Sequence, residues 1–222
     1  MAEDTSIPPS QTLTRRLRSL IANLDTTSVE STAERVCEWI DSFEDNDDRF
    51  RGLLRLCAEL VLEKAMERPN KDFRHVLGRF CKILDISTDG ESSRFLNSLW
   101  KQEIQAAGVE LLANDMAEAG SWPEYLALVV FAGELCDEAL LQPDPLRSCA
   151  NMLSDSRSNL GLELACTFFE VTRSALREDH DGKKYFDSAI QIMLTASKGD
   201  GISARIRHRV QVGVQGLRYR SF

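Results

Sequence analysis

The side chains best suited to catalysis or metal binding are few and dispersed in this chain. Its three histidines are His75, His180 and His208. None of them stands at metal-ligand spacing from a second histidine or from a cysteine pair. The Gly-x-Ser-x-Gly, P-loop and Gly-x-Gly-x-x-Gly sequences that mark nucleophile and phosphate sites do not occur. We therefore predict no catalytic residue, no bound metal and no cofactor.

The positions of the acidic residues and the cysteines also favour a non-enzymatic protein without a small-molecule substrate. The acidic clusters at residues 44–48 and 178–181 are typical of solvated loops. The six cysteines lack the close paired spacing of zinc sites, and most of them fall on apolar helix faces. We expect buried, reduced thiols at these positions, namely Cys37, Cys57, Cys81, Cys136, Cys149 and Cys166.

Basic side chains gather near the C-terminus of an otherwise acidic chain. Residues 198–222 hold six basic residues and one acidic residue. Arg205 and Arg209 are one helical turn apart, whereas Arg207 points away from them. We predict that Arg205, Arg207 and Arg209 contact RNA phosphates or an acidic partner. Cations that meet the dipole of a helix C-terminus are the structural alternative. The basic cluster Arg15, Arg16 and Arg18 is a similar candidate, and a solvated helix face is the structural alternative there.

Composition indicates a soluble, intracellular and cytoplasmic protein. The chain has 222 residues, 43% of them hydrophobic, a formal charge of −8 and a sequence pI of about 5.0. This length is ample for one packed core. No leader peptide pattern opens the chain, and no run of roughly 18 apolar residues suits a membrane. We predict a flexible segment over residues 1–10 and one domain over residues 11–222.

Apolar residues recur at helical period along nearly the whole chain, so we predict an all-α protein. Leu13, Leu17, Leu20 and Leu24 form one stripe, and residues 29–43 form another, with cap-type residues 25–28 between them. Four further helix pairs follow, over 53–68 with 73–84, 95–106 with 126–135, 146–153 with 160–175, and 186–193 with 202–217.

About five helix pairs give one helical hairpin roughly every 40 residues, the period of HEAT-type repeats. A single hairpin cannot bury its apolar face, whereas stacked hairpins share a core and leave a surface for partners. Periodicity alone supports a stack of helices, and the HEAT assignment comes from a resemblance.

Residues 60–69 carry that resemblance most clearly. The segment is similar to the phenylalanine-glutamate-lysine-alanine helix end in the middle domain of eukaryotic translation initiation factor 4G. Glu63, Lys64 and Ala65 match, and Leu62 stands where the family usually has phenylalanine. Four more segments resemble the family in the same order along the chain, namely 15–24, 94–103, 131–135 and 205–218.

The resemblance implies a HEAT-type solenoid of about five antiparallel helix pairs forming a crescent. It also implies a scaffold that docks a DEAD-box RNA helicase in translation initiation, and possibly RNA. At matching positions, Leu20, Leu24, Leu62, Glu63 and Lys64 are the implied partner-binding residues. Leu20 and Leu24 are equally compatible with a core role. The alternative is an adaptor of the same fold in mRNA metabolism that binds neither helicase nor RNA.

Overall fold

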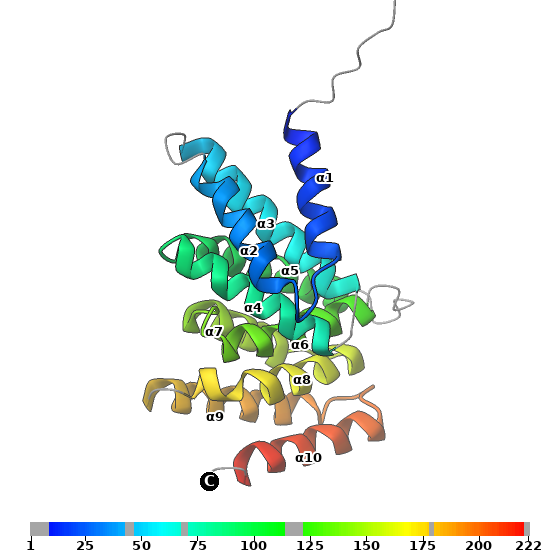
Figure 1. The fold of residues 1–222 in the computed structure, drawn as a ribbon. Helices are drawn as coiled ribbons and strands as arrows, with labels where there is room; N and C mark the ends of the chain where they lie inside the picture. Colours follow the sequence, from blue (N-terminus) through cyan, green and yellow to red (C-terminus); the bar gives the residue numbers. More distant parts are fainter. Residues whose placement is uncertain (1–8, 43–46, 68–70, 114–121, 178–179, 220–222) are drawn as a thin grey trace, which may run out of the picture. The chain divides into compact units, whose positions relative to one another are not determined.

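The computed structural model describes residues 9–42, 47–67, 71–113, 122–177 and 180–219 (Figure 1). Ten helices and no strand lie in these ranges, which confirms the predicted all-α class. The chain divides into two compact units, Met1–Leu96 and Asn97–Phe222. Residues 1–8 of the predicted flexible segment lie outside the described part. Pro9 and Ser10 already belong to the first helix, where proline is tolerated because the first turn needs no backbone donor.

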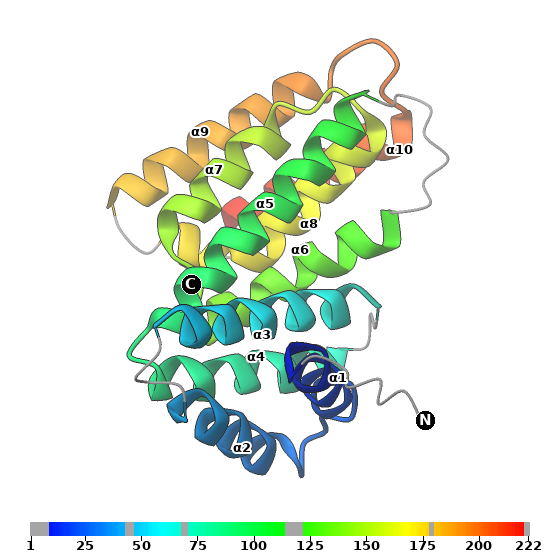
Figure 2. The ribbon, with the colours of Figure 1, turned by 90° about the horizontal axis from the view of Figure 1, so that it is seen from above.

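The first unit contains α1–α4 and the start of α5. α1 packs on α3, and α2 packs on both α3 and α4 (Figures 1 and 2). The helix bounds are α1 Pro9–Ala22, α2 Val29–Asp41, α3 Asp47–Glu67, α4 Lys71–Ser87 and α5 Glu91–Ala113.

The buried face of α1 differs from the predicted stripe. Leu17, Ile21 and Leu24 are buried, whereas Leu13 and Leu20 are only half-buried. Leucines at 13 and 20 and isoleucine at 21 allow two overlapping apolar faces, and packing on α3 selects the face that contains Ile21. The predicted stripe of α2 is confirmed over Val29, Ala33, Val36 and Ile40, all of which are buried.

Asp25 holds the turn between α1 and α2, where cap-type residues were predicted, and Ser28 is the N-cap residue of α2. The Asp25 carboxylate accepts hydrogen bonds from the backbone N–H groups of Thr27 and Ser28, both at 2.8 Å, and from the Thr27 hydroxyl at 2.7 Å. These hydrogen bonds lower the pKa of Asp25 from its ordinary 3.8 to about 2, and those donated by Thr27 have the largest effect. The turn that starts α2 is therefore held by an ionised carboxylate.

The second unit is organised around α8, which contacts each of the other complete helices in that unit (Figure 2). A row of aromatic contacts joins Trp100, Phe168, Phe169 and Phe186, with ring centroids 5.5 to 6.2 Å apart. The helix bounds are α6 Trp122–Asp137, α7 Pro143–Ser154, α8 Asn159–Leu176, α9 His180–Ala196 and α10 Ala204–Tyr219.

Close approach of α6 and α8 depends on Gly133. A Cβ at this position would lie 2.9 Å from Cβ of Val171, closer than side chains tolerate. The Phe131–Leu135 segment that resembles the translation factor therefore has a packing role in this chain. Asn97 is buried and fixes the connection after α6, because its amide donates to the Leu140 carbonyl at 2.7 Å and accepts from the Gln142 N–H at 2.8 Å.

The cysteines follow the prediction of buried, unpaired thiols. None of the six forms a disulfide; five are buried, and Cys136 is half-buried. Burial raises the pKa of Cys57, Cys136 and Cys149 to about 12, so these thiols stay protonated at neutral pH. None of the described helices combines the length and the apolar composition that spanning a membrane requires.

Candidate partner-binding surfaces

Residues 60–67 of the helicase-type motif lie on α3, which packs on α1, and the exposed side chains of Arg18 and Glu63 define what we call the α1–α3 surface. The Arg18 guanidinium and the Glu63 carboxylate form an ion pair at 3.2 Å across the two helices. Their side chains are 52% and 39% exposed, so a partner can reach both of them. Leu20 is half-buried and, two residues from Arg18, lies on a different side of α1.

Three other predicted partner-binding residues are buried beneath this surface. Leu24 and Leu62 are 4% and 3% exposed, respectively, and belong to the core of the first unit. Lys64 is 9% exposed and donates to the Glu67 carboxylate within α3. In this conformation the motif fixes the position of α3, and the side chains that it offers to a partner are Glu63 and its neighbours on α1. Pro69, which ends the motif, lies outside the described residues.

The three predicted basic residues of α10 divide between two faces, as their spacing predicts. Arg205 forms two hydrogen bonds to the carboxylate of Glu163 on α8, at 2.9 and 3.3 Å. Arg209 donates to the Thr167 hydroxyl at 3.3 Å and lies 3.7 Å from the Glu170 carboxylate. Arg207 turns the other way, toward the backbone carbonyl of Gly199.

Between α8 and α10 runs an open groove of about 640 Å³, which we call the α8–α10 groove. Arginine and histidine side chains line one part of it, and Val212 with two glycines lines another. A Cβ at Gly213 would meet Glu170 Oε1 at 3.7 Å, whereas a Cβ at Gly216 would meet nothing within 4 Å. The lining residues are Glu170, Arg173, Arg205, His208, Arg209, Val212, Gly213 and Gly216.

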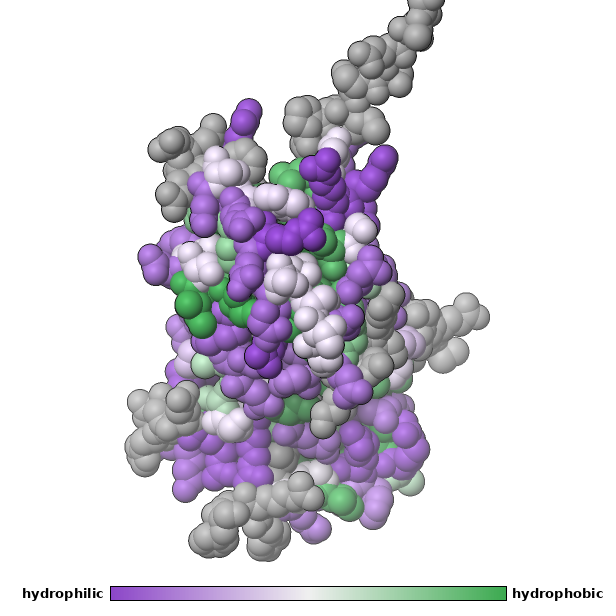
Figure 3. Space-filling view, in the orientation of Figure 1, coloured by the Kyte–Doolittle hydropathy of each residue, from purple (hydrophilic) through white to green (hydrophobic). Residues whose placement is uncertain are grey.

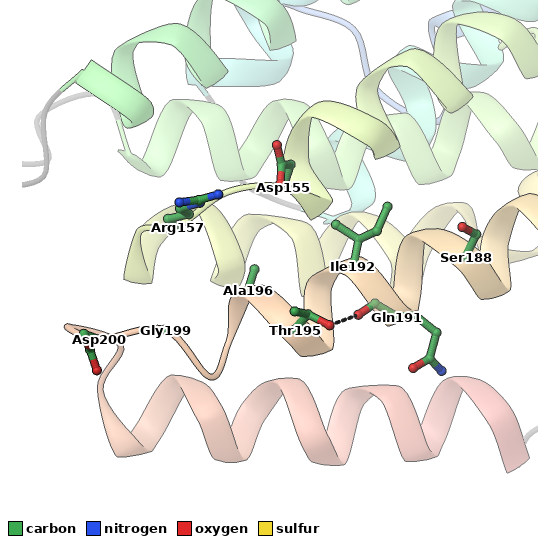
Figure 4. A pocket seen from close by; sticks show the side chains of 9 residues that line it. All are labelled: Asp155, Arg157, Ser188, Gln191, Ile192, Thr195, Ala196, Gly199 and Asp200. Carbon is green, nitrogen blue, oxygen red and sulfur yellow. Dashed lines mark hydrogen bonds between the residues drawn. The ribbon is translucent and has the colours of Figure 1, made fainter.

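A second hollow, of about 570 Å³, lies along α9 (Figure 4). Asp155 and Arg157 on the connection between α7 and α8 line it together with Ile192 and Ala196 of α9. The Thr195 hydroxyl, also at its edge, donates to the Gln191 carbonyl within the helix. The charged side chains of Asp155 and Arg157 make this hollow a polar contact surface. Its lining residues do not bring a nucleophile and a base together.

Hydrophobic exposure in the described residues is concentrated at a few positions. On the face drawn in Figure 3, hydrophilic residues predominate, and hydrophobic ones form small separate groups. The exposed large hydrophobic side chains are Ile86, Ile192 and Val212. Two of these three line the hollows of the second unit, Ile192 along α9 and Val212 in the α8–α10 groove.

Metal-binding geometry is not found in the part of the chain that the structure describes, where no three His, Cys, Asp or Glu side chains are grouped suitably. His75 and His208 are exposed on different helices, α4 and α10. Part of what the sequence analysis singled out lies outside the described residues, namely the acidic Glu44, Asp45, Glu178 and Asp179, residues 114–121 and the basic Arg220.

Sequence reasoning missed the partners of the basic residues. Glu163, Thr167 and Glu170 follow helical spacing along one face of α8, and this face meets Arg205 and Arg209. The spacing was visible in the sequence, but only the contact between α8 and α10 shows that it faces the arginines.

Comparison with known proteins identifies no relative of this chain. No known protein-family profile matches the chain, and a search of curated proteins finds no match.

Proposed function

We propose that this chain is a non-enzymatic scaffold that resembles the middle domain of translation initiation factor 4G and docks a DEAD-box RNA helicase. Such a scaffold acts by contacting both lobes of the helicase. It then favours the arrangement of lobes that binds RNA and ATP, because it stabilises that arrangement over the others. The proposal includes a HEAT-type stack of helix pairs and its crescent shape.

The order of helix contacts is the observation that carries this proposal. α8 packs on both α6 and α10, α7 packs on α9, and within the first unit α1 packs on α3 and α2 on α4. Contacts between each helix and the second helix along the chain are what stacked hairpins produce, because equivalent helices of successive repeats lie side by side. The motif segments resemble the factor in the same order as these helices.

Charge at the α1–α3 surface supports a docking role there. Glu63 and Arg18 are exposed and lie on different helices, so they present a fixed pair of opposite charges. Such charges mainly increase the rate of association with a partner of complementary charge and fix the orientation of that partner. In the second unit, the exposed Arg205 and Arg207 are the corresponding candidates.

A second candidate function is an adaptor of the same fold that binds neither helicase nor RNA. Burial of Leu24 and Leu62 favours it, because a partner at the α1–α3 surface then meets few apolar atoms. Central apolar anchors usually supply most of the energy of an interface. An adaptor would therefore use the exposed apolar side chains of the second unit instead.

Helicase binding is tested by capture of a purified initiation-type DEAD-box helicase on the immobilised chain, followed by the RNA-dependent ATPase assay. We expect capture and stimulation, and we expect Glu63→Arg to reduce both because it reverses the charge at the α1–α3 surface. Glu34→Arg is the matched control, since Glu34 is exposed on α2 and does not belong to this surface. Circular dichroism checks the fold of each variant. No capture at low salt by a folded wild-type chain would refute the helicase proposal and leave the adaptor.

A further inference from the structure

The α8–α10 groove has a basic half and an apolar half. Arg205, His208 and Arg209 occupy the first two turns of its α10 wall, with Arg173 on the wall formed by α8. Val212 and Gly216 occupy the following turns, where Val212 is 51% exposed. A ligand that fits both halves must therefore carry negative charge at one end and an apolar group at the other.

Carboxylates already occupy part of the basic half. Glu163 pairs with Arg205 through two guanidinium nitrogens, and Glu170 lies beside Arg209. An arginine side chain has five N–H donors, so Arg205 keeps donors for a further acceptor after it has bound Glu163. Its side chain is 70% exposed, which leaves those donors within reach of a ligand.

We propose that the α8–α10 groove binds a short acidic peptide segment of a partner protein, in which acidic residues adjoin an apolar side chain. The carboxylates contact Arg205 and Arg173, and the apolar side chain packs on Val212 in the space above Gly216. From Arg205 to Gly216 the helix rises by roughly 16 Å, which about five extended residues span. This assignment rests on the proposed scaffold function, because it treats the chain as a binding platform.

A peptide fits this groove better than RNA does. Among the described residues that line the groove there is no phenylalanine, tyrosine or tryptophan, and His208 is the single ring that a base could stack on. Glu163 and Glu170 stand beside two of the arginines and repel a chain of phosphates, in which every unit is charged. A peptide instead needs only one or two carboxylates and gains from the exposed valine, which a sugar-phosphate backbone does not use.

Fluorescence anisotropy with defined probes tests the assignment. The probe is a labelled peptide with two glutamates next to leucine-phenylalanine, used in both sequence orders. Controls are the same peptides with glutamine for glutamate or with serine for the apolar pair, and a uridine oligonucleotide of similar length. We expect saturable binding of at least one order, and binding weaker by about tenfold when either half of the peptide is changed.

Two variants of the chain probe the two halves of the groove. Arg205→Gln removes a donor, and Gly216→Leu fills open space without changing charge. Each should weaken peptide binding by about tenfold, while Arg207→Gln, on the opposite face of the same helix, should change it by less than about twofold. Val212→Ser is the second apolar variant if circular dichroism shows that Gly216→Leu disturbs the fold.

Several outcomes would overturn the proposal. They are the absence of saturation by every peptide, tighter binding of the oligonucleotide than of the peptides, and an equal loss with Arg207→Gln and Arg205→Gln. Helicase capture by the Gly216→Leu variant separates the two proposals. Retained capture with lost peptide binding supports both, whereas peptide binding by a chain that captures no helicase supports the groove and refutes the helicase.

Discussion

The α1–α3 surface and the α8–α10 groove use similar side chains in different ways. In the first unit, most residues of the family-like motif are buried, and one ion pair, Arg18 with Glu63, marks the surface. In the second unit, the basic side chains lie on an open groove and pair with carboxylates of the neighbouring helix. The same periodic sequence pattern thus produces a packing element in one unit and an accessible charged surface in the other.

This difference separates the positions that stabilise the helices from the positions that we propose for recognition. Leu62, Lys64 and Ala65 of the motif are buried, so most of the motif describes a helix face that packs. In our proposals, recognition is assigned to positions on other faces, such as Glu63, Arg205 and Val212, whose surroundings depend on which helix lies opposite.

The largest expected effect is the loss of stability in Leu62→Ala. Leu62 is 3% exposed, so the variant removes buried methyl groups and leaves a cavity. We expect the free energy of unfolding to fall by about 2–5 kcal/mol. Urea denaturation followed by circular dichroism measures this change. Glu63→Ala, one residue further along α3, should change it by less than about 1 kcal/mol.

The opposite result for Leu62→Ala would change the role that we assign to the motif in the first unit. If Leu62→Ala keeps its stability and loses partner binding, Leu62 is a contact residue and the motif marks an interface. Stability and binding must therefore be measured on the same preparation.

The next largest effect is the change in stability when two glycines are replaced by alanine, and the two changes should have opposite signs. Gly133→Ala places a Cβ 2.9 Å from Val171 and should destabilise the second unit by about 1–3 kcal/mol. Gly216→Ala faces open space in α10 and should stabilise the protein by up to about 1 kcal/mol, because alanine has the higher helix propensity. Thermal unfolding of the two variants measures both changes. An equal change in stability for the two variants would mean that α6 and α8 do not approach each other closely at Gly133.

The sequence was sufficient to predict the helices and insufficient to predict which of their faces meet. The period of the apolar residues fixes an all-α fold, and Asp25 with Ser28 fixes a helix start, because both signals act over a few residues. The buried face of α1 was misassigned, since Leu20 and Ile21 are adjacent and only packing on α3 decides between them. The groove was beyond prediction, because Glu163 and Arg205 are 42 residues apart.

The inter-helix ion pairs should contribute less than either packing effect. Arg18→Ala and Arg205→Ala each remove one such pair and should lower the free energy of unfolding by less than about 1 kcal/mol. The Arg205 pair should be the stronger of the two, since it has two hydrogen bonds and its Glu163 side chain is 20% exposed. A double-mutant cycle with Glu163→Gln, repeated at high salt, measures the coupling. A coupling that salt leaves unchanged would contradict an exposed ion pair.

The smallest effect concerns the starts of two helices and distinguishes the units by pH. Asp25 holds the turn before α2 as a carboxylate whose pKa lies near 2 instead of 3.8, whereas α8 is capped by the Ser158 hydroxyl, which accepts from the Gly161 N–H at 3.0 Å. Because the folded pKa of Asp25 is the lower one, its contribution is complete above pH 4 and is lost as the pH falls toward 2. The difference in unfolding free energy between wild type and Asp25→Ala should therefore shrink over this range. The difference for Ser158→Ala should stay constant, because a hydroxyl does not titrate there. Urea titrations at several pH values measure both differences, and a constant difference for Asp25→Ala would show that its hydrogen bonds do not depend on the ionised carboxylate.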